Sequence, residues 1–566
     1  MSLVRFINVS WSGPMVSAAG CFPDLGRRIL AIVRGVVLLS GMAVGLAAAP
    51  IWQQVDGDGF VVLTPDKPSE AVAAAHEFRH FMAGLGGMIK VDTSRLSPLT
   101  IVMLRHGRAF RPYRPLNNRN KPIDVAGFFW RDVDWSVSAL AGRWGDGEQS
   151  HVLRHEGVHW FLSGLDFDRP LWFEEGLAEV FSTYRLRKGV PVWGEPIPHH
   201  VALLRSAAPL PIERLMIITA QDPLYNESTL SGVFYASSWL FAHYLLFGDH
   251  ELPRNSVDQY LTALLVPGSR EAAFLSAFRR DYAGMDAALR DYLRRGRFAY
   301  FEGQTLEAAA FVARPALMAR VEEALAKVAI AGGNVKLAEK HLAELRRLDP
   351  ESVVVDEVAG YIARQQRDYS GMRAAFARAA ERGSRDVGVY HWPATLPRAY
   401  GDGGIGEATE SQLEELAELH RGAIRLRPAF LSAYSNLARV LMGISYNRPG
   451  DRELLEEGFK RNPADARIAA ALAVFQHREG EVEAAVPLMR EVLFVGEARQ
   501  ELELARFARW TLVDWDFLLM ARAIQDALEA GDMAAARSLY ERLAAEGVSP
   551  HRRGDLIFLR RAVEPK

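Results

Sequence analysis

Two histidines four residues apart, with a glutamate directly after the first, are the residues in this chain best suited to chemistry. They lie in the stretch LRHEGVHWFL, residues 153–162, as His155, Glu156 and His159. On a helix, residues i and i+4 share one face, so both imidazoles can reach a single metal ion. The glutamate lies about 100° further round, where it can polarise a metal-bound water instead of ligating. The spacing predicts a zinc site with its own general base.

The chain carries a second copy of this pattern, HEFRH, at residues 76–80. Here Arg79 stands between the two histidines, and its charge would oppose that of a metal ion. The residues that follow, FMAGLGGMIKV, contain no carboxylate-bearing helix. We interpret this copy as a surface helix outside the site.

A third ligand for the first copy is available in LWFEEGLAEVF, residues 171–181. Gly164 and Pro170 break the chain before this second helical stretch, which can then return Glu175 to the two histidines. Three protein ligands leave the fourth position open for water, as catalysis requires. Glu179 lies one turn beyond Glu175 on the same face and can accept a hydrogen bond from the outer nitrogen of a ligand histidine.

The elements that must position these residues mix strands and helices. GFVVLT and PLTIVML have the pattern of strands, and residues 70–85 between them that of an amphipathic helix. DVAGFFWRDVDWSVSAL predicts a strand pair, and after residue 148 the pattern is almost wholly helical. Residues 50–304 are therefore predicted to form an α+β domain, a small mixed sheet plus helices.

Beyond residue 305 the sequence becomes rich in alanine and leucine and carries little strand signal. Ala338, Leu342 and Leu345 recur 34 residues later as Met372, Phe376 and Ala379. A 34-residue helix–turn–helix period is typical of tetratricopeptide repeats. We expect residues 305–566 to form an all-α solenoid of such repeats; the alternative is an irregular helical domain without true repeats.

The amino terminus has the pattern of an export signal. Arg27, Arg28 and Arg34 precede the apolar run GVVLLSGMAVGL, and AAAP follows. This pattern predicts a signal peptide with an amino-terminal extension, residues 1–49, cut after Ala49, and a protein that acts in the periplasm or outside the cell. The alternative is an uncleaved membrane anchor at residues 29–49.

Composition limits the remaining function classes. The chain has 566 residues, which exceeds the usual size of one hydrophobic core, so at least two domains are expected. Its formal charge of −2 gives no global basic field for a nucleic-acid partner. Cys21 is the only cysteine, so a metal site after residue 49 must use histidine and carboxylate ligands.

At HEGVH and PLWFEEGLAE the chain resembles the gluzincin zinc metallopeptidases, the thermolysin-like clan. It looks closest to a bacterial exported branch, the peptidase-MA-like proteins, which are often fused to tetratricopeptide repeats. The resemblance covers roughly residues 50–300. It implies a zincin-like fold, Zn²⁺ as cofactor on His155, His159 and Glu175, Glu156 as general base, and Glu179 supporting a ligand histidine.

The resemblance extends to FYASSWLFAHYLL, residues 234–246, where Tyr235 matches a tyrosine that donates to the oxyanion in this family. A half-buried aromatic at a helix start is the other interpretation of Tyr235. The stretch VAGFFW resembles the edge strand that pairs with a bound peptide. Around Gly127 the sequence has Phe128, Phe129 and Trp130 where aminopeptidase members carry an amine-binding glutamate, which favours endopeptidase action.

The predicted function is therefore zinc-dependent hydrolysis of a peptide or protein substrate, with the repeats binding substrate or a protein partner. A membrane is involved only if the amino-terminal segment stays uncleaved. Two alternatives remain open. The chain could be a non-catalytic repeat scaffold with a vestigial zinc domain. The presence of Glu156 argues against this, because a site that no longer catalyses needs no general base. It could also hydrolyse an amide of a cell-wall component, since the zinc chemistry is the same.

Overall fold

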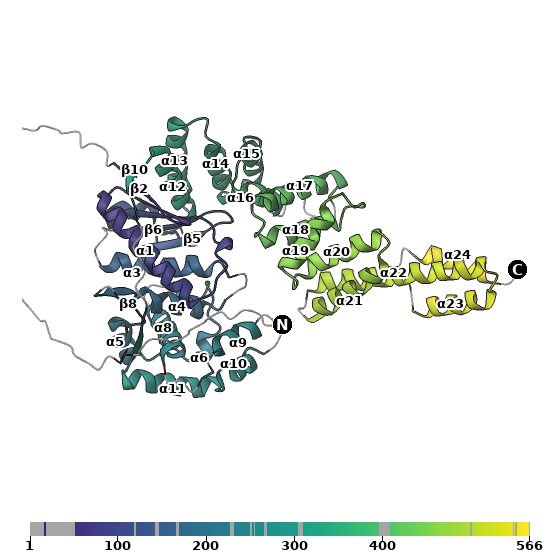
Figure 1. The fold of residues 1–566 in the computed structure, drawn as a ribbon, viewed down its shortest axis with the longest axis horizontal. Coiled ribbons are helices and arrows are strands. Elements are labelled where there is room, and N and C mark those ends of the chain that lie inside the picture. Colours follow the sequence, from purple (N-terminus) through teal and green to yellow (C-terminus); the bar gives the residue numbers. More distant parts are fainter. Residues whose placement is uncertain are drawn as a thin grey trace, which may run out of the picture. The chain divides into compact units, whose positions relative to one another are not determined.

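The protein is mostly helical, with small sheets gathered in its amino-terminal half (Figure 1). The computed structural model describes residues 16–17, 51–117, 120–141, 147–165, 169–188, 190–226, 231–248, 252–253, 255–264, 269–303, 310–395, 408–498, 501–546, 548 and 552–564. Contacts divide the chain into one unit of residues 1–375 and a second of residues 376–566. The predicted signal peptide, except for residues 16–17, lies outside the described residues. Among the described helices, none is both long and apolar enough to cross a bilayer.

The first unit is built on a mixed sheet of six strands. Its spatial order is β10 (Arg314–Pro315), β2 (Gln53–Asp56), β3 (Phe60–Thr64), β4 (Leu99–Leu104), β6 (Ser136–Ala141) and β5 (Gly127–Arg131). Strands β3, β4 and β6 are parallel, and β5 turns back antiparallel to β6. The four strands predicted from the sequence, β3 to β6, are confirmed. Among the described strands β5 pairs on one side alone, so it forms an edge.

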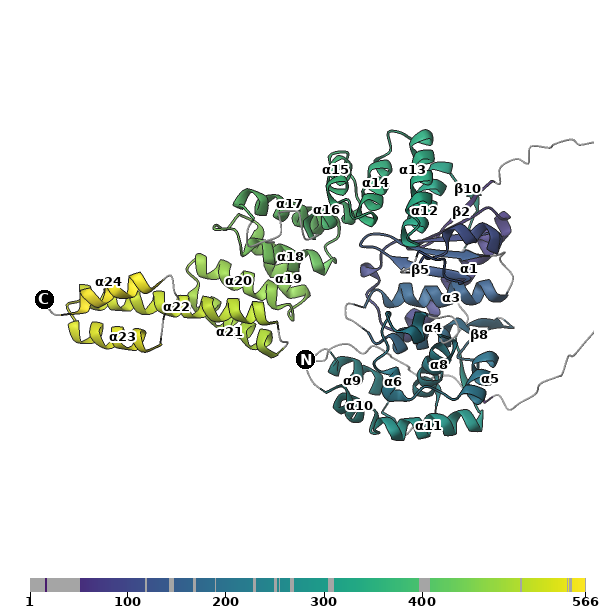
Figure 2. The ribbon, with the colours of Figure 1, turned by 180° about the vertical axis from the view of Figure 1, so that it is seen from behind.

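Helices cover both faces of this sheet. α1 (Pro68–Met88) and α3 (Gly147–Leu162) pack on one face, where Val62, Ile101 and Phe78 are fully buried. α12 (Met318–Ala331) contacts β4 and β6. Figures 1 and 2 both show the sheet between α12 and α3. Val102 and Val137 alternate with the residues that face α1 and are also fully buried, because the second face is covered too.

A second, smaller sheet corrects the expectation that the chain after residue 148 is almost wholly helical, because three of its strands lie in that part. Its order is β1 (Val16–Ser17), β9 (Ala299–Glu302), β8 (Val190–Trp193) and β7 (Arg185–Arg187). These strands have two to four residues, too few for alternation to register as a period.

The other helices of the first unit lie between or after the strands along the chain. Before residue 305 they are α2 (Gly107–Phe110), α4 (Leu171–Ser182), α5 (Pro198–Ala207), α6 (Ile212–Leu215), α7 (Pro223–Asn226), α8 (Ser231–Phe247), α9 (Ser256–Ala263), α10 (Arg270–Phe278) and α11 (Tyr282–Arg295), with 3₁₀ turns at Thr93–Arg95 and Arg111–Tyr113. The apolar helix α8 is buried almost throughout and contacts α4, α5, α6, α7 and α11.

After residue 310 the described chain is helical apart from β10. α12, α13 (Val335–Leu348), α14 (Val353–Gln365) and α15 (Tyr369–Glu381) follow one another as successive pairs. The residues that recur every 34 positions face the interior: Ala338 and Leu345 of α13, like Met372 and Ala379 of α15, are at most 1% exposed. Contacts place α12, α13 and α14 in the first unit, whereas the sequence texture changes at residue 305.

The second unit continues with helices joined in series. They are α16 (Val387–Thr395), α17 (Glu410–Leu426), α18 (Leu431–Leu441), α19 (Asp451–Arg461), α20 (Ala466–Arg478), α21 (Val482–Ala498), α22 (Leu502–Glu529), α23 (Met533–Glu546) and α24 (Arg553–Val563). Gly480 and Gly531 take φ values of +88° and +76° in tight helix–helix turns, a backbone region that favours glycine.

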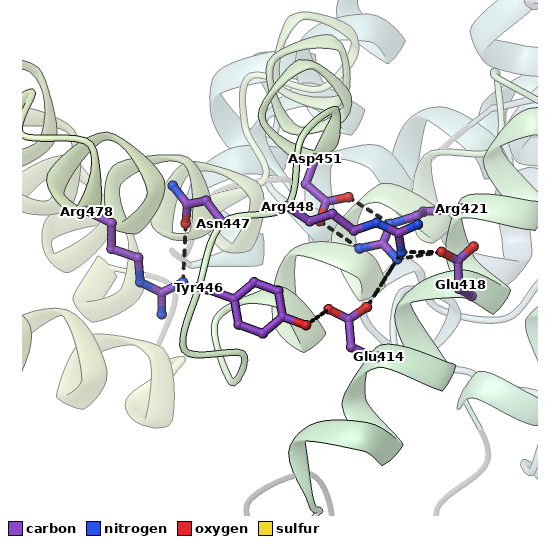
Figure 3. Close-up of polar contacts among 8 residues, drawn as sticks. All are labelled: Glu414, Glu418, Arg421, Tyr446, Asn447, Arg448, Asp451 and Arg478. Atoms are coloured by element: carbon purple, nitrogen blue, oxygen red, sulfur yellow. Dashed lines mark hydrogen bonds and ion pairs between the residues drawn. The ribbon is translucent and has the colours of Figure 1, made fainter.

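An ion-pair network joins these helices side to side. Arg421 of α17 donates to both carboxylate oxygens of Asp451 in α19, at 2.7 and 2.6 Å, and both side chains are buried (Figure 3). Tyr446, in the loop before α19, donates to Glu414 of α17 at 2.8 Å. A bidentate arginine–carboxylate pair fixes orientation as well as distance. The network therefore holds the angle between α17 and α19.

Candidate metal centre

The candidate ligands lie on two helices, and a glycine in each helix lets it pack closely on a further helix. α3 carries His155 and His159, and α4 carries Glu175. A Cβ on Gly176 would come within 2.5 Å of the Ser238 carbonyl oxygen of α8. A Cβ on Gly157 would come within 2.8 Å of the Phe78 ring of α1. Both glycines of the motifs thus permit a helix contact that a larger residue would prevent.

The three ligand atoms form a nearly equilateral triangle. The Nε2 atoms of His155 and His159 are 3.2 Å apart, and each is 3.4 Å from Oε2 of Glu175. Zinc bonds of about 2.0–2.1 Å in a tetrahedron place neighbouring ligand atoms about 3.3 Å apart. Within the described residues these three side chains form the one group of at least three histidine, cysteine or acidic residues with ligand atoms close enough for an ion.

The protein atoms alone leave this triangle unsatisfied. Oε2 of Glu175 is buried and has no hydrogen-bond partner, although a buried carboxylate oxygen normally has one. Burial raises the pKa of Glu175, but His159 and His155 outweigh burial and hold it below its ordinary value. An orphaned carboxylate oxygen facing two imidazole nitrogens fits a divalent cation of the zinc type.

Burial and neighbouring charges also shift the pKa values of the histidines and of Glu156. Burial lowers the pKa of His155, but the carboxylates of Glu175, Glu179 and Glu156 raise it to about 9. The pKa of His159 is raised by Glu175 against the same effect of burial. Burial raises the pKa of Glu156, while the two histidines and the backbone N–H of Phe129 act against the rise. A carboxylate of raised pKa beside the candidate ligands is a better proton acceptor than an exposed glutamate.

Glu179 lies behind the ligands, as the helix spacing predicts. Its Oε1 is 3.6 Å from Nδ1 of His155. Its Oε2 is hydrogen-bonded at 3.1 Å to Nε2 of His200, a buried residue of α5, and lies 3.9 Å from Nε2 of His151. Three imidazoles therefore surround one carboxylate. Sequence reasoning missed His200, which no local pattern links to α3, and His151, whose i−4 spacing from His155 was the available signal.

Two tyrosines cover the other side of the triangle. Tyr225 of α7 donates a hydrogen bond to Oε1 of Glu175 at 3.1 Å. Tyr235, the residue singled out by the sequence, lies beside it on α8: its ring centre is 6.0 Å from that of Tyr225 and 6.4 Å from that of His155. Burial raises the pKa of both phenols, so both keep their protons and can donate. Tyr225 was missed because α7 is four residues long and carries no periodic pattern.

Other residues considered in the sequence lie elsewhere. Glu174 points away from the histidines and pairs with Arg169 at 2.8 Å. His76 and His80 belong to α1 and take no part in the cluster. That helix is exposed at Arg79, but its opposite face is in the core, where Phe78 and Phe81 are fully buried, so it is more than a surface helix.

Comparison with known proteins finds similarity only among solved structures. No protein-family model matches the chain, and no curated protein does. Several of the matching structures are described as tetratricopeptide-repeat proteins. They include YrrB, described as having an unusual peptide-binding site (13% identity, 32% of this chain and 88% of that one, TM-score 0.26), and a repeat protein of Parabacteroides merdae (13%, 43% and 98%, 0.24). At these TM-scores we draw no function from the likeness.

Proposed function

We propose that the protein is a zinc-dependent peptide-bond hydrolase of the gluzincin type. The observation that carries the proposal is the triangle of His155, His159 and Glu175, with sides of 3.2 to 3.4 Å and an unpartnered buried oxygen at one corner. A cation held there would supply a Lewis acid for the scissile carbonyl and lower the pKa of a water.

The chain's own residues would carry the remaining steps. Glu156 would accept a proton from the attacking water and return it to the leaving nitrogen. Tyr235 keeps its phenolic proton and would donate to the oxygen that gains charge in the transition state, while Tyr225 donates its proton to Glu175 and would orient that ligand. β5 would hold an extended substrate by strand addition at its unpaired edge. In the sequence motif that the chain resembles, Phe128, Phe129 and Trp130 occupy the stretch in which aminopeptidase members carry an amine-binding glutamate, which favours an endopeptidase.

The site of action that we propose is outside the cytoplasm. The proposal rests on the basic and apolar pattern of residues 27–49. The helical repeats favour a second function, the binding of a protein partner or substrate, because stacked helix pairs present extended surfaces. A repeat scaffold without catalysis is the competing proposal, and hydrolysis of a cell-wall amide is a variant of the first.

One matched pair of variants tests catalysis against scaffolding. Glu156→Gln should keep the fold and the metal and abolish hydrolysis of a denatured polypeptide mixture. Glu174→Gln, on the next helix but facing Arg169, should leave hydrolysis within about twofold of wild type, because its side chain contacts Arg169 instead of the candidate ligands and glutamine keeps an acceptor oxygen for that arginine. Chelator should remove wild-type activity. Full activity in Glu156→Gln would refute the general-base role, and no hydrolysis by wild type loaded with zinc would favour the scaffold.

A further inference from the structure

The edge strand beside Glu156 lies along helix α3 over its whole length. At one end, a Cβ on Gly127 would come within 2.5 Å of the Val152 side chain. In the middle, the backbone N–H of Phe129 faces the Glu156 carboxylate. At the other end, Arg131 donates to the Ser163 carbonyl just after the helix. The position of β5 therefore sets what lies next to the proposed general base.

The turn that joins β5 to β6 is fixed from outside the sheet. The turn closes through a hydrogen bond from the Asp132 N–H to the Trp135 carbonyl at 2.8 Å, and Oδ1 of Asp132 accepts from the Val133 N–H at 2.8 Å. The same carboxylate binds both terminal nitrogens of Arg364, which comes from α14, more than two hundred residues later. The Asp132 side chain is 2% exposed and that of Arg364 is 12% exposed.

Aromatic contacts reinforce this ion pair. The Arg364 guanidinium lies 5.2 Å from the centre of the Tyr361 ring. Tyr361 in turn meets Trp135 edge-on, with ring centres 5.4 Å apart. On α12, the ammonium of Lys327 lies 5.5 Å from the Trp135 ring centre. Two helices of the repeat-like segment thus contact one turn of the sheet: α12 through Lys327, and α14 through a buried bidentate pair that fixes orientation as well as distance.

We propose that Arg364 is a positioning residue of the candidate site: through Asp132 it fixes the β5–β6 turn, and with it the edge strand along which a peptide would bind beside Glu156. The proposal rests on the proposed peptidase function for its effect on catalysis, but the mechanical link stands on the contacts alone. It follows that α12 and α14 support the edge strand from outside the sheet. A ligand that moves α14 would act on the edge strand.

The test removes the ion pair without leaving a buried charge. Arg364→Met alone would leave the buried Asp132 carboxylate without its arginine, so this variant could fail to fold. The double variant Asp132→Asn/Arg364→Met keeps an oxygen for the Val133 N–H and leaves neither charge. Arg347→Met is the control: it breaks an exposed pair with Glu344 on α13 of the same helical segment, with side chains 66% and 41% exposed.

Amide hydrogen exchange of the full-length protein tests whether α14 stabilises β5, and it needs no assay of activity. In the double variant we expect amides of residues 127–131 to exchange about tenfold faster, as local opening becomes easier, while residues 153–160 of α3 and the zinc content stay as in wild type. The Arg347→Met control should match wild type. Unchanged exchange in β5 of the double variant would overturn the inference.

Kinetics then separate a positioning role from general destabilisation. For an unfolded polypeptide substrate, we expect KM to rise about five- to tenfold in the double variant while kcat falls less than about threefold, because zinc and Glu156 stay in place. An unchanged KM in an active double variant would also overturn the inference. Absence of hydrolysis by wild type would refute the proposed function instead, and hydrogen exchange would still decide the link between α14 and β5.

Discussion

Replacing Gly176 by alanine should destabilise the protein, whereas the same substitution at an exposed helix position should stabilise it. Replacing a helical glycine by alanine usually stabilises a helix by about 0.5–1 kcal/mol. At Gly176 the new Cβ would lie 2.5 Å from the Ser238 carbonyl oxygen and 2.8 Å from Cβ of Ala242. Both atoms belong to a buried helix that cannot yield as a flexible side chain would. At Gly87 of α1, nothing lies within 4 Å of the new Cβ.

The magnitude follows from overpacking. Extra volume in a well-packed core costs about 1–3 kcal/mol, which exceeds the propensity gain, so Gly176→Ala should lower the free energy of unfolding by about 1–2 kcal/mol. To relieve the contact α4 must move away from α8 by several tenths of an ångström. Glu175, the preceding residue, moves with it. Zinc affinity should therefore fall about tenfold, although all three ligands are intact.

Two assays check this prediction on the full-length chain. Urea unfolding in the presence of chelator gives the stability of the metal-free protein, and competition with a coloured chelator gives the zinc dissociation constant. Gly87→Ala should be as stable as wild type or up to about 1 kcal/mol more stable, with unchanged zinc affinity. If Gly176→Ala behaves like Gly87→Ala in both assays, the argument that close α4–α8 packing positions Glu175 is wrong.

Three further predictions concern residues outside the ligand triangle. His200→Ala removes the 3.1 Å hydrogen bond to Glu179 and should weaken zinc binding about three- to tenfold by chelator competition; wild-type affinity would contradict this. Tyr225→Phe removes the 3.1 Å hydrogen bond to Glu175 and should weaken zinc binding about tenfold in the same competition; an unchanged zinc dissociation constant would contradict this. His420 is fully buried, neither ring nitrogen has a hydrogen-bond partner, and burial lowers its pKa to about 3. Because the unfolded chain binds the proton below about pH 6.5, stability should fall by about 2 kcal/mol between pH 6.5 and 5, and His420→Leu should remove that part of the urea-unfolding difference.

The sequence predicted the elements with long, clear periods and the closeness of the candidate ligands tied to them. β3, β4 and the helix between them have runs of alternating or helical apolar residues, and both helices of the candidate metal centre carry short motifs with fixed spacing. The buried positions that recur every 34 residues, such as Ala338 and Met372, were predicted for the same reason. Spacing along the sequence is enough to predict that two side chains lie close together when both belong to the same helix or strand.

The remainder depends on contacts between distant parts of the chain. α12 has the texture of a repeat helix, and only packing shows that it covers β4 and β6. Tyr225 and His200 reach the site from α7 and α5, and Arg364 reaches Asp132 from α14. No periodicity links these residues to their partners. Short strands such as β8, which pairs with β9 more than a hundred residues later, were missed on the same physical grounds.

The central claim, that His155, His159 and Glu175 bind one zinc ion, is tested most directly by X-ray absorption at the zinc edge, with metal analysis of the same sample. For wild type loaded with zinc and dialysed, the account predicts one zinc per chain with two imidazole nitrogens and oxygen ligands at about 2.0–2.1 Å. It predicts less than about a tenth of that zinc in His155→Ala prepared in the same way, since a ligand has been lost. Stoichiometric zinc in His155→Ala, or an absorption spectrum without imidazole, would contradict it.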